Sequence, residues 1–275
     1  MSRVWLITGA NSGFGRAFTE AAVAAGDVVV AAARRPETLA DLVEAHPSQV
    51  EAARLDVTDL AAGRALVDDV VARHGRIDVL VNNAGRTHLG AAEETTEAEL
   101  RDLFELHFFA PAELVRAVLP HMRGRRSGAI VQLSSMGGQL SFAGFSAYSA
   151  TKFALEGLSE ALADEVRPLG VKVLVVEPGA FRTTLFGNAS ASGEIEDYDA
   201  TVGNTRRMVA SADGTQPGDP AKAAAAVLAA LDAEDTPLRL PLGGDAVDAL
   251  LGHLDSVRTE IVAWEKTTRA TDFDA

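Results

Sequence analysis

Tyr148 and Lys152 stand four residues apart in a stretch, residues 147–166, whose composition predicts a helix. Side chains four apart lie on one face of a helix, about 6 Å apart along its axis. The pKa of a free tyrosine is about 10, and a neighbouring ammonium lowers it because it stabilises the phenolate. Such a pair can exchange protons with a substrate as an acid and base. Taken alone, the same spacing also fits a half-buried tyrosine beside a solvated lysine.

The composition narrows the classes of protein to consider. The 275 residues suit one large α/β domain, with two small domains as the alternative, and a hydrophobic fraction of 47% provides for a sizeable core. The absence of cysteine excludes disulfides, thiolate catalysis and cysteine-based zinc sites, and no metal site is predicted. The formal net charge of −14 makes nucleic acid and anionic membranes poor partners.

The apolar runs of the sequence are short. None approaches the ~18 residues that a transmembrane helix needs, so no membrane span is expected. The apolar N-terminus, residues 1–7, is too short for a secretory leader and is interpreted as a buried strand. With the lack of cysteine, these features predict a cytoplasmic protein.

A glycine-rich turn follows the first predicted strand, residues 4–7, and precedes a helical run, residues 16–25. Gly9, Gly13 and Gly15 permit a tight turn and a close approach of backbone to a phosphate, and the helix N-terminus adds N–H groups and a positive dipole end. The spacing, Gly-x-x-x-Gly-x-Gly, differs from the Gly-x-Gly-x-x-Gly dinucleotide fingerprint. The strand before and the helix after favour a phosphate site over a plain turn, without specifying the ligand.

Two arginines, Arg34 and Arg35, follow the second predicted strand, residues 27–33. In doubly wound folds an acidic side chain at this place receives the ribose 2′-hydroxyl of NAD, whereas an arginine matches a 2′-phosphate. The sequence therefore favours NADP(H) over NAD(H). A solvated basic loop is the alternative.

Polar residues also follow the later strands. Ligands bind at the carboxyl ends of strands in open parallel sheets, so we expect these residues to lie near one another, although asparagine and glycine also favour turns. The predicted strands and the residues after them are 50–55 with Asp56 and Val57, 77–81 with Asn82, Asn83, Ala84 and Gly85, 128–133 with Ser134 and Ser135, and 171–176 with Pro178, Gly179, Phe181 and Thr183.

Helices are predicted between these strands, and a last strand at residues 237–242. The alternation predicts a single NAD(P)-binding domain over residues 1–275, an α/β fold with a Rossmann-type doubly wound, largely parallel seven-stranded sheet in three layers. The polar segment 184–218 shows little periodicity and is interpreted as a substrate lid. The helices expected are 37–45, 60–74 capped by Asp59, a helix that starts with a Thr96/Glu99 capping box and runs toward Pro120 with a kink at Pro111, 220–231, and 247–264 with a frayed end from Lys266.

The order of these motifs resembles the single-domain type of the short-chain dehydrogenase/reductase family, over roughly residues 3–245. Each motif alone is weak, but five of them in order with family-like spacing are specific. The resemblance rests on the turn Thr8-Gly9-Ala10-Asn11-Ser12-Gly13-Phe14-Gly15, on Asn82-Asn83-Ala84-Gly85, on Ser134-Ser135, on Tyr148 with Lys152, and on Pro178-Gly179 with Thr183.

The resemblance implies a role for each matching residue. Tyr148 would exchange a proton with the substrate oxygen, and Lys152 would lower its pKa and bind the nicotinamide ribose. Ser135, thirteen residues before the tyrosine, would hold the substrate carbonyl. Thr183 would contact the carboxamide, Asp56 the adenine, and Asn83 would shape the adenine-ribose region. The full cofactor set implied is Gly9, Asn11, Ser12, Gly13, Phe14, Gly15, Arg34, Arg35, Asp56, Val57, Asn83, Ala84, Gly85, Tyr148, Lys152, Pro178, Gly179, Phe181 and Thr183.

His107 stands where the family usually has an asparagine that supports a water-linked proton path to the lysine. A histidine can donate and accept protons, and it titrates near physiological pH. We expect it to carry the relay as a fourth catalytic residue; filling a helix kink is the alternative.

Two functions follow from these residues. The first is an NADP(H)-dependent oxidoreductase that interconverts an alcohol and a carbonyl by hydride transfer; the second is an NADP(H)-binding sensor without turnover. Such a sensor would be expected to lack one of Ser135, Tyr148 and Lys152, and all three are present.

The substrate and the oligomeric state are less constrained. An apolar, roomy pocket is predicted, hence a hydrophobic alcohol or ketone. Its walls would include Gly137, Gly138, Leu140, Phe142, Phe145, Phe181, Leu185 and Phe186. The family often forms dimers or tetramers through its fourth and fifth helices, so a homodimer or homotetramer is expected; Phe108, Phe109 and Leu155 are compatible with this.

Overall fold

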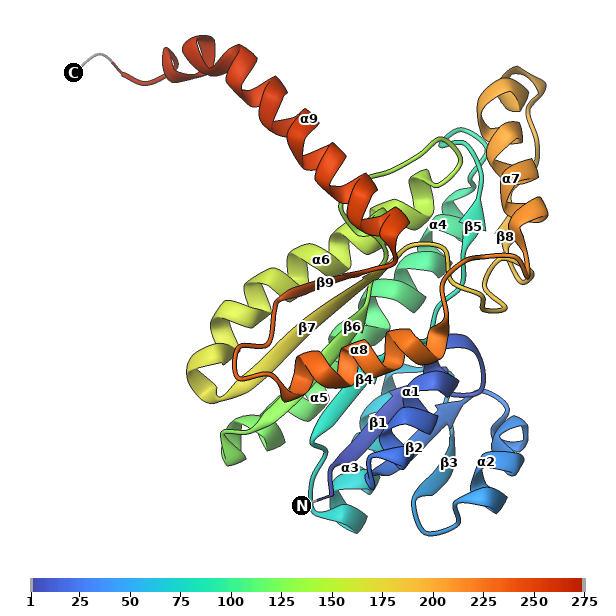
Figure 1. Ribbon diagram of the computed structural model, residues 1–275, viewed down its shortest axis with the longest axis vertical. Coiled ribbons are helices and arrows are strands. Elements are labelled where there is room, and N and C mark those ends of the chain that lie inside the picture. The colour runs from blue at the N-terminus through green and yellow to red at the C-terminus, as the bar shows by residue number, and fades with distance from the viewer. Residues whose placement is uncertain (1, 274–275) are drawn as a thin grey trace.

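The computed structural model describes residues 2–273 and shows helices packed on both sides of a parallel sheet (Figure 1). The strands are β1 Val4–Thr8, β2 Val28–Ala33, β3 Val50–Arg54, β4 Val79–Asn82, β5 His88–Leu89, β6 Gly128–Leu133, β7 Val171–Pro178, β8 Ser190–Ala191 and β9 Arg239–Leu242. The helices are α1 Gly13–Ala24, α2 Ala40–Ala45, α3 Leu60–His74, α4 Glu97–Phe104, α5 Ala110–Arg125, α6 Ser146–Val166, α7 Asn204–Ala212, α8 Pro220–Asp232 and α9 Gly244–Arg269.

The main sheet has seven strands in the order β3-β2-β1-β4-β6-β7-β9, and each neighbouring pair runs parallel. The order reverses its direction between β1 and β4, as in doubly wound folds, so a crevice opens there at the carboxyl ends of the strands. This confirms the predicted Rossmann-type, three-layer α/β fold.

Successive strand residues point to opposite faces, and both faces are buried. In β1, Trp5 and Ile7 pack into the core formed with α1 and α8, whereas Val4 and Leu6 pack into the core formed with α3, α5 and α6. This explains why the strands appear in the sequence as continuous apolar runs rather than as alternating ones.

Two helix starts form as the sequence predicts. The Asp59 side chain accepts a hydrogen bond from the Ala62 N–H at 2.9 Å and caps α3. Thr96 and Glu99 form a complete capping box at the start of α4. These local signals hold because each side chain satisfies a backbone N–H that has no partner inside the helix.

The helix predicted from Thr96 to Pro120 differs from expectation in two ways. Its irregularity is a π-helical turn, Glu105–Phe109, that joins α4 to α5 without a break in the helical backbone, and Pro111 follows it as the second residue of α5. The helix then continues past Pro120 to Arg125. A π turn inserts an extra residue, which turns the side chains before α5 toward a new direction.

Two other segments are more regular than predicted. Residues 184–218 contain β8, which pairs with β5 in a separate two-stranded sheet, a π-helical turn at Asp199–Gly203, and α7. The last helix begins at Gly244 and runs to Arg269 instead of fraying from Lys266. Among residues 2–273, no helix combines the length and the apolar character that a membrane crossing requires.

Candidate active site

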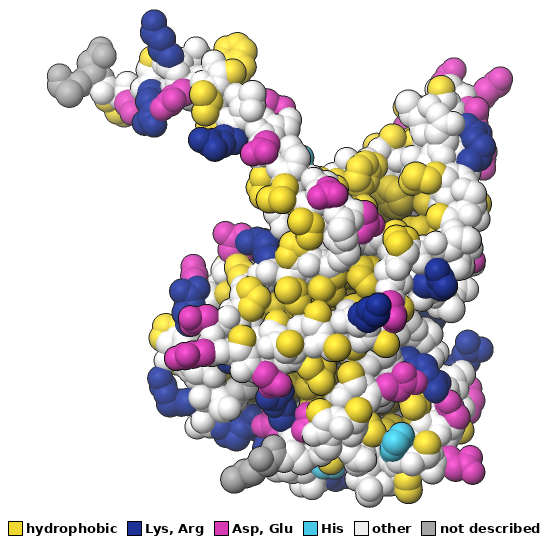
Figure 2. Space-filling model, viewed as in Figure 1, with side chains coloured by type: hydrophobic (Ala, Val, Ile, Leu, Met, Phe, Trp, Pro, Cys, Tyr) yellow, Lys and Arg dark blue, Asp and Glu magenta, His cyan; other side chains and the backbone are white. Residues whose placement is uncertain are grey.

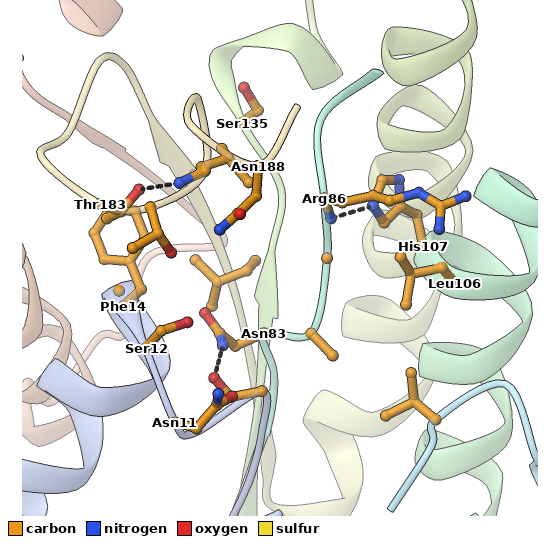
Figure 3. Close-up of a pocket in the computed structure, with 18 of the residues that line it drawn as sticks. Asn11, Ser12, Phe14, Asn83, Arg86, Leu106, His107, Ser135, Thr183 and Asn188 are labelled. Carbon is orange, nitrogen blue, oxygen red and sulfur yellow. Dashed lines mark hydrogen bonds between the residues drawn. The ribbon is translucent and has the colours of Figure 1, made fainter. Parts of the chain in front are cut away.

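A cleft of about 810 Å³ opens at the carboxyl ends of the central strands. It brings together every site residue predicted from the sequence except Gly15, which is buried beneath the first turn. In Figure 3, Asn11, Ser12 and Thr183 lie on one side of the cleft, while Arg86 and His107 lie on the other. The cleft also gathers residues that no sequence motif singles out: Thr58, Arg86, Asp102, Glu105, Leu106, Thr184 and Asn188.

The turn before α1 is held open toward the cleft by its glycines. Gly9 and Gly13 have φ angles of +63° and +51°, a region that other residues rarely adopt. Asn83, at the end of β4, donates from Nδ2 to the Thr8 carbonyl at 2.8 Å and to the Gly9 carbonyl at 3.2 Å. The Thr8 hydroxyl accepts from the backbone N–H groups of Asn83 and Ala84. Asn83 therefore braces this turn, so that the N-terminus of α1 faces the cleft.

The rim beyond β2 and β3 carries charges of both signs. Arg34 and Arg35 are exposed and line the cleft. Asp56 accepts hydrogen bonds from the Thr58 hydroxyl at 2.7 Å and its backbone N–H at 3.1 Å. The hydroxyl bond is the main cause that lowers the pKa of Asp56, with a contribution from the charge of Arg34. Asp56 is therefore ionised at neutral pH and can accept hydrogen bonds.

Tyr148 and Lys152 are buried at the inner end of the cleft. The Lys152 ammonium lies 5.7 Å from the centre of the Tyr148 ring and donates to the Leu133 carbonyl at 2.7 Å. Ser135 lies beside the phenol, and its Oγ accepts from the Gly137 N–H at 3.0 Å. Three elements, β6, the turn after it and α6, thus bring these side chains together.

Burial controls the acidity of this pair. Burial raises the pKa of Tyr148 to about 12, although the Ser135 hydroxyl acts to lower it. Burial lowers the pKa of Lys152 to about 8, although the charge of Glu156 acts to raise it. The sequence leads to the expectation that Lys152 lowers the pKa of Tyr148; in the folded chain, desolvation of the phenol raises that pKa, and the lowering contribution comes from Ser135. At neutral pH the site therefore holds a protonated phenol beside a charged ammonium.

His107 lies in the π turn, is 1% exposed, and has a partner at each ring nitrogen. Nε2 accepts from the Arg86 N–H at 3.2 Å, so the proton resides on Nδ1, which lies 2.9 Å from the Thr151 hydroxyl. Thr151 in turn donates to the Tyr148 carbonyl at 2.7 Å. Burial, with the charges of Lys152 and Arg86, holds the pKa of His107 well below its usual value. The ring is therefore neutral at pH 7 and links the loop after β4 to the backbone of Tyr148.

A buried carboxyl pair lies behind Lys152. Glu156, one helical turn further along α6, and Glu177, at the end of β7, are 4% and 0% exposed. Burial and the charge of Glu156 raise the pKa of Glu177 to about 7. Gln139 donates a hydrogen bond to Glu177, and Arg239 donates one to Glu156 and forms an ion pair with Glu177. Within residues 2–273, Glu156 Oε1 and Glu177 Oε2 have no other hydrogen-bond partner, which a proton shared between the two carboxyl groups explains. Sequence reasoning missed this pair because its members stand 21 residues apart on different elements.

The predicted apolar wall is formed in part. Phe181, Leu185 and Phe186 line the cleft, whereas Gly137, Gly138, Leu140, Phe142 and Phe145 are outside its lining. Leu140 is buried, and Phe142 is 47% exposed. The difference arises because the chain after β6 forms a 3₁₀ turn, Met136–Gly138, that packs against α6 rather than over the cleft.

The segment 184–218 is anchored beside the cleft by buried polar contacts. Glu94 is 8% exposed, pairs with Arg206 at 3.0 Å, and accepts from the Ile195 N–H at 2.8 Å. His88 contacts the hydroxyls of Ser190 and Ser192 at 2.9 and 2.8 Å. These contacts fix β8 and α7 against the loop after β4, so Thr184, Leu185, Phe186 and Asn188 are held at the cleft.

Comparisons with known proteins agree with this geometry. Residues 3–193 match the family model of the short chain dehydrogenases. A protein of Botryotinia fuckeliana named oxidoreductase BOA17 is 38% identical over 250 residues, which cover 90% of this chain and 91% of that protein. A 3-ketodihydrosphingosine reductase of Bacteroides thetaiotaomicron is 39% identical over 199 residues, 71% of either chain.

Solved structures show the same fold. A short-chain dehydrogenase from Streptomyces avermitilis superimposes with a TM-score of 0.94 at 66% identity and covers 98% of either chain. A metagenomic short-chain oxidoreductase in complex with NADP has a TM-score of 0.69 at 30% identity, covering 88% of this chain and 97% of its own. A Burkholderia phymatum relative in complex with NAD has a TM-score of 0.83 at 25% identity, covering 96% and 95%. Similar chains thus bind either nicotinamide dinucleotide.

Proposed function

Because the chain belongs to the short-chain dehydrogenase/reductase family of oxidoreductases, we propose that it interconverts a hydrophobic alcohol and its carbonyl compound with NADP(H). The observation that carries the proposal is the convergence of Ser135, Tyr148 and Lys152 at the inner end of the cleft. A protonated phenol and a hydroxyl beside a charged ammonium are the groups that a reduction at a carbonyl requires.

The residues present fit a dinucleotide. The glycine turn and the N-terminus of α1 offer backbone N–H groups to phosphates, and Ser12, at the helix cap, makes no capping hydrogen bond with its side chain. Arg34 and Arg35 would hold a 2′-phosphate, Asp56 the adenine, and Thr183 the carboxamide. Bound there, the nicotinamide would supply or take up the hydride at the substrate carbon.

The chain's own groups would manage the proton. With a pKa of about 12, Tyr148 stays protonated at pH 7 and gives its proton to the substrate oxygen as negative charge develops on it. The Ser135 hydroxyl would donate a hydrogen bond to the same oxygen. Lys152, fixed by the Leu133 carbonyl, would stabilise the resulting phenolate through its charge. The reverse steps would serve alcohol oxidation.

The preference for NADP(H) is tested by removing its arginines. Replacing both Arg34 and Arg35 by alanine should weaken NADPH binding about 10- to 100-fold, because charge-assisted bonds to a phosphate are lost, and should leave NADH binding unchanged. Fluorescence titration measures both constants. Arg54→Ala, an exposed arginine at the end of β3 outside the cleft, is the matched control. Equal or tighter binding of NAD by the unaltered protein would contradict the preference.

His107 acts, we propose, by positioning rather than by the relay expected from the sequence, because both of its ring nitrogens are engaged. His107→Ala should lower kcat several-fold, since Arg86 and Thr151 lose their shared partner. The pH profile of kcat/KM should stay unchanged, because a pKa well below 6.5 keeps the ring neutral across the working range. If the acid or alkaline limb of the kcat/KM profile shifted in both His107→Ala and His107→Asn, that result would contradict the positioning role and support a proton relay through His107.

A sensor that binds NADP(H) without turnover is the second candidate, and the replacement of the family's asparagine by His107 is the feature that favours it. NADPH consumption with a panel of carbonyl compounds separates the two. Binding without turnover of any compound would support the sensor.

The substrate class rests on the apolar residues Phe181, Leu185 and Phe186 at the cleft. Leu185 and Phe186 belong to the anchored segment 184–218, which would act as the lid over an apolar substrate. The name of the Bacteroides relative, a ketone reductase, is consistent with a hydrophobic ketone.

A further inference from the structure

The buried carboxyl groups of Glu156 and Glu177 have no part in the proton transfer described so far. Figure 2 shows acidic and basic side chains gathered at the edge of the molecule where α6 lies, as is usual for charged groups on a helix. Glu156 belongs to the same helix but is buried, and so is Glu177 at the end of β7. Because a buried charge is costly unless it is paired, the charge of this pair needs a partner inside the protein.

Hydrogen bonds determine how the two carboxyl groups face each other. Glu177 Oε1 accepts from Gln139, and Glu156 Oε2 accepts from Arg239 Nε at 3.1 Å. Glu156 Oε1 and Glu177 Oε2 are the oxygens that have no other partner in the described chain, and a hydrogen bond between the two side chains is among the causes that raise the pKa of Glu177. The proton therefore resides on Glu177 Oε2, which donates to Glu156 Oε1, and the negative charge stays on Glu156.

The nearest use for that charge is the ammonium of Lys152. Glu156 stands one helical turn after Lys152 on the same face of α6. Lys152 is 6% exposed, and burial lowers its pKa to about 8, while the charge of Glu156 acts to raise it. Tyr148 and His107 are the other titratable side chains around the ammonium, and both are uncharged at pH 7. Without Glu156, the lysine would lose its proton closer to neutral pH.

The other charged groups around the pair do not replace Glu156 in this role. Arg239, on β9, contacts Glu156 and Glu177 and also pairs at 2.6 Å with Glu160, on the exposed side of α6. The group that faces Glu177 from the turn after β6 is a neutral amide. A proton on Glu177 leaves one negative charge on the pair, opposite the one positive charge of Lys152.

We infer that Glu156 is a positioning residue that acts through Lys152: its carboxylate keeps the lysine charged, and the proton that it shares with Glu177 limits the buried negative charge to one. The inference rests on the proposed function, in which the ammonium of Lys152 stabilises the phenolate of Tyr148. A neutral lysine would not stabilise that phenolate.

The charge of Lys152 can be measured without substrate or cofactor, because the chain has only four lysines. NMR of protein with isotope-labelled lysine follows each ammonium as the pH rises, and Lys152→Arg identifies the signal. Glu156→Gln keeps the shape of the side chain but removes its charge, so it should lower the pKa of Lys152 by about 1. Circular dichroism confirms that the variant is folded.

Glu160→Gln is the matched control. It removes the same charge and a contact with Arg239 one turn further along α6, where the side chain is 62% exposed, and it should leave the pKa of Lys152 unchanged. The same pKa of Lys152 in Glu156→Gln as in the unaltered protein would overturn the inference.

Turnover tests whether the charge serves the reaction. In the unaltered protein kcat/KM should fall above about pH 8, where Lys152 loses its proton. In Glu156→Gln this limb should move to lower pH, so that kcat/KM near pH 8 falls about fivefold, and Glu160→Gln should keep the profile. A pKa of Lys152 that moves without any change in the kcat/KM profile would refute the role in the reaction. Absence of turnover in the unaltered protein would contradict the proposed function instead, and the NMR titration would then decide whether Glu156 sets the charge of Lys152.

The shared proton is tested through stability. The pKa of Glu177 is about 7, against an ordinary value of 4.5. Between these values the unfolded chain releases a proton that the folded chain keeps, so stability falls as the pH rises through this range and stays lower above it. Glu177→Gln keeps a donor toward Glu156 and an acceptor toward Gln139 without an ionisable group. Its melting temperature should exceed that of the unaltered protein by several degrees near pH 8, and the difference should shrink toward pH 4. A difference that is the same at both pH values would contradict the shared proton.

Discussion

Changing Tyr148 to phenylalanine should lower kcat about a thousandfold and leave NADPH affinity within a few-fold of the unaltered protein. The substitution removes the hydroxyl that exchanges the proton, and general acid catalysis contributes roughly 10²- to 10⁴-fold. The ring itself stays, so the packing around a side chain that is 9% exposed is preserved. Single-turnover oxidation of NADPH and fluorescence titration measure the two effects.

The chain supplies a matched control, because it has two tyrosines. Tyr198 lies on the surface, where its hydroxyl donates to Glu93 at 2.7 Å. Tyr198→Phe removes the same atom away from the cleft and should keep full turnover. Unchanged turnover in Tyr148→Phe as well would refute its role as the acid.

Gly15→Ala should abolish NADPH binding and destabilise the fold by about 1–3 kcal/mol, the range for an overpacked site. A Cβ at this position would overlap the Gly9 carbonyl oxygen and lie 2.5 Å from Asn83 Nδ2. Contacts this short force the turn and its brace apart, and the first of them is with backbone that has no rotamer to change. Fluorescence titration and thermal unfolding report the two losses.

Gly157→Ala is the control for that change. This glycine lies on the exposed side of α6, and a Cβ there meets no atom within 4 Å. Alanine in a helix interior should stabilise the protein by about 0.5–1 kcal/mol. If Gly15→Ala behaved in the same way, the close approach at the first turn would have no structural importance.

The sequence predicted the strands and the meeting place of the site because both depend on local patterns and on one topological rule. Continuous apolar runs indicate strands buried on both faces, and parallel strands end at the same edge of a sheet. The rule assigns Ser135, which follows β6, to this edge, whereas Tyr148 lies in α6 and was assigned to the same cleft through the family resemblance. The acid pair of Glu156 and Glu177 escaped prediction because nothing local in a sequence reports which helix residue faces which strand end.

The pKa values of Tyr148 and Lys152 also escaped prediction. The spacing of Tyr148 and Lys152 indicates attraction between them, but the degree of desolvation depends on how the surrounding helices pack. The π turn that carries His107 was missed for a related reason: an extra residue in a helix leaves the apolar spacing on either side nearly regular.

The two open edges of the sheet bear on how copies of this protein can associate. At one edge β3 is short and carries Glu51 and Arg54, and Glu51 is paired with Arg73. At the other edge β9 has four residues, among them Pro241, which has no N–H to offer a further strand. Charged and proline-bearing edges discourage lateral growth of a sheet and the fibrous aggregation that follows from it. Helical surfaces would then be the ones left for an association of copies, since contacts between helices are finite and can close upon themselves.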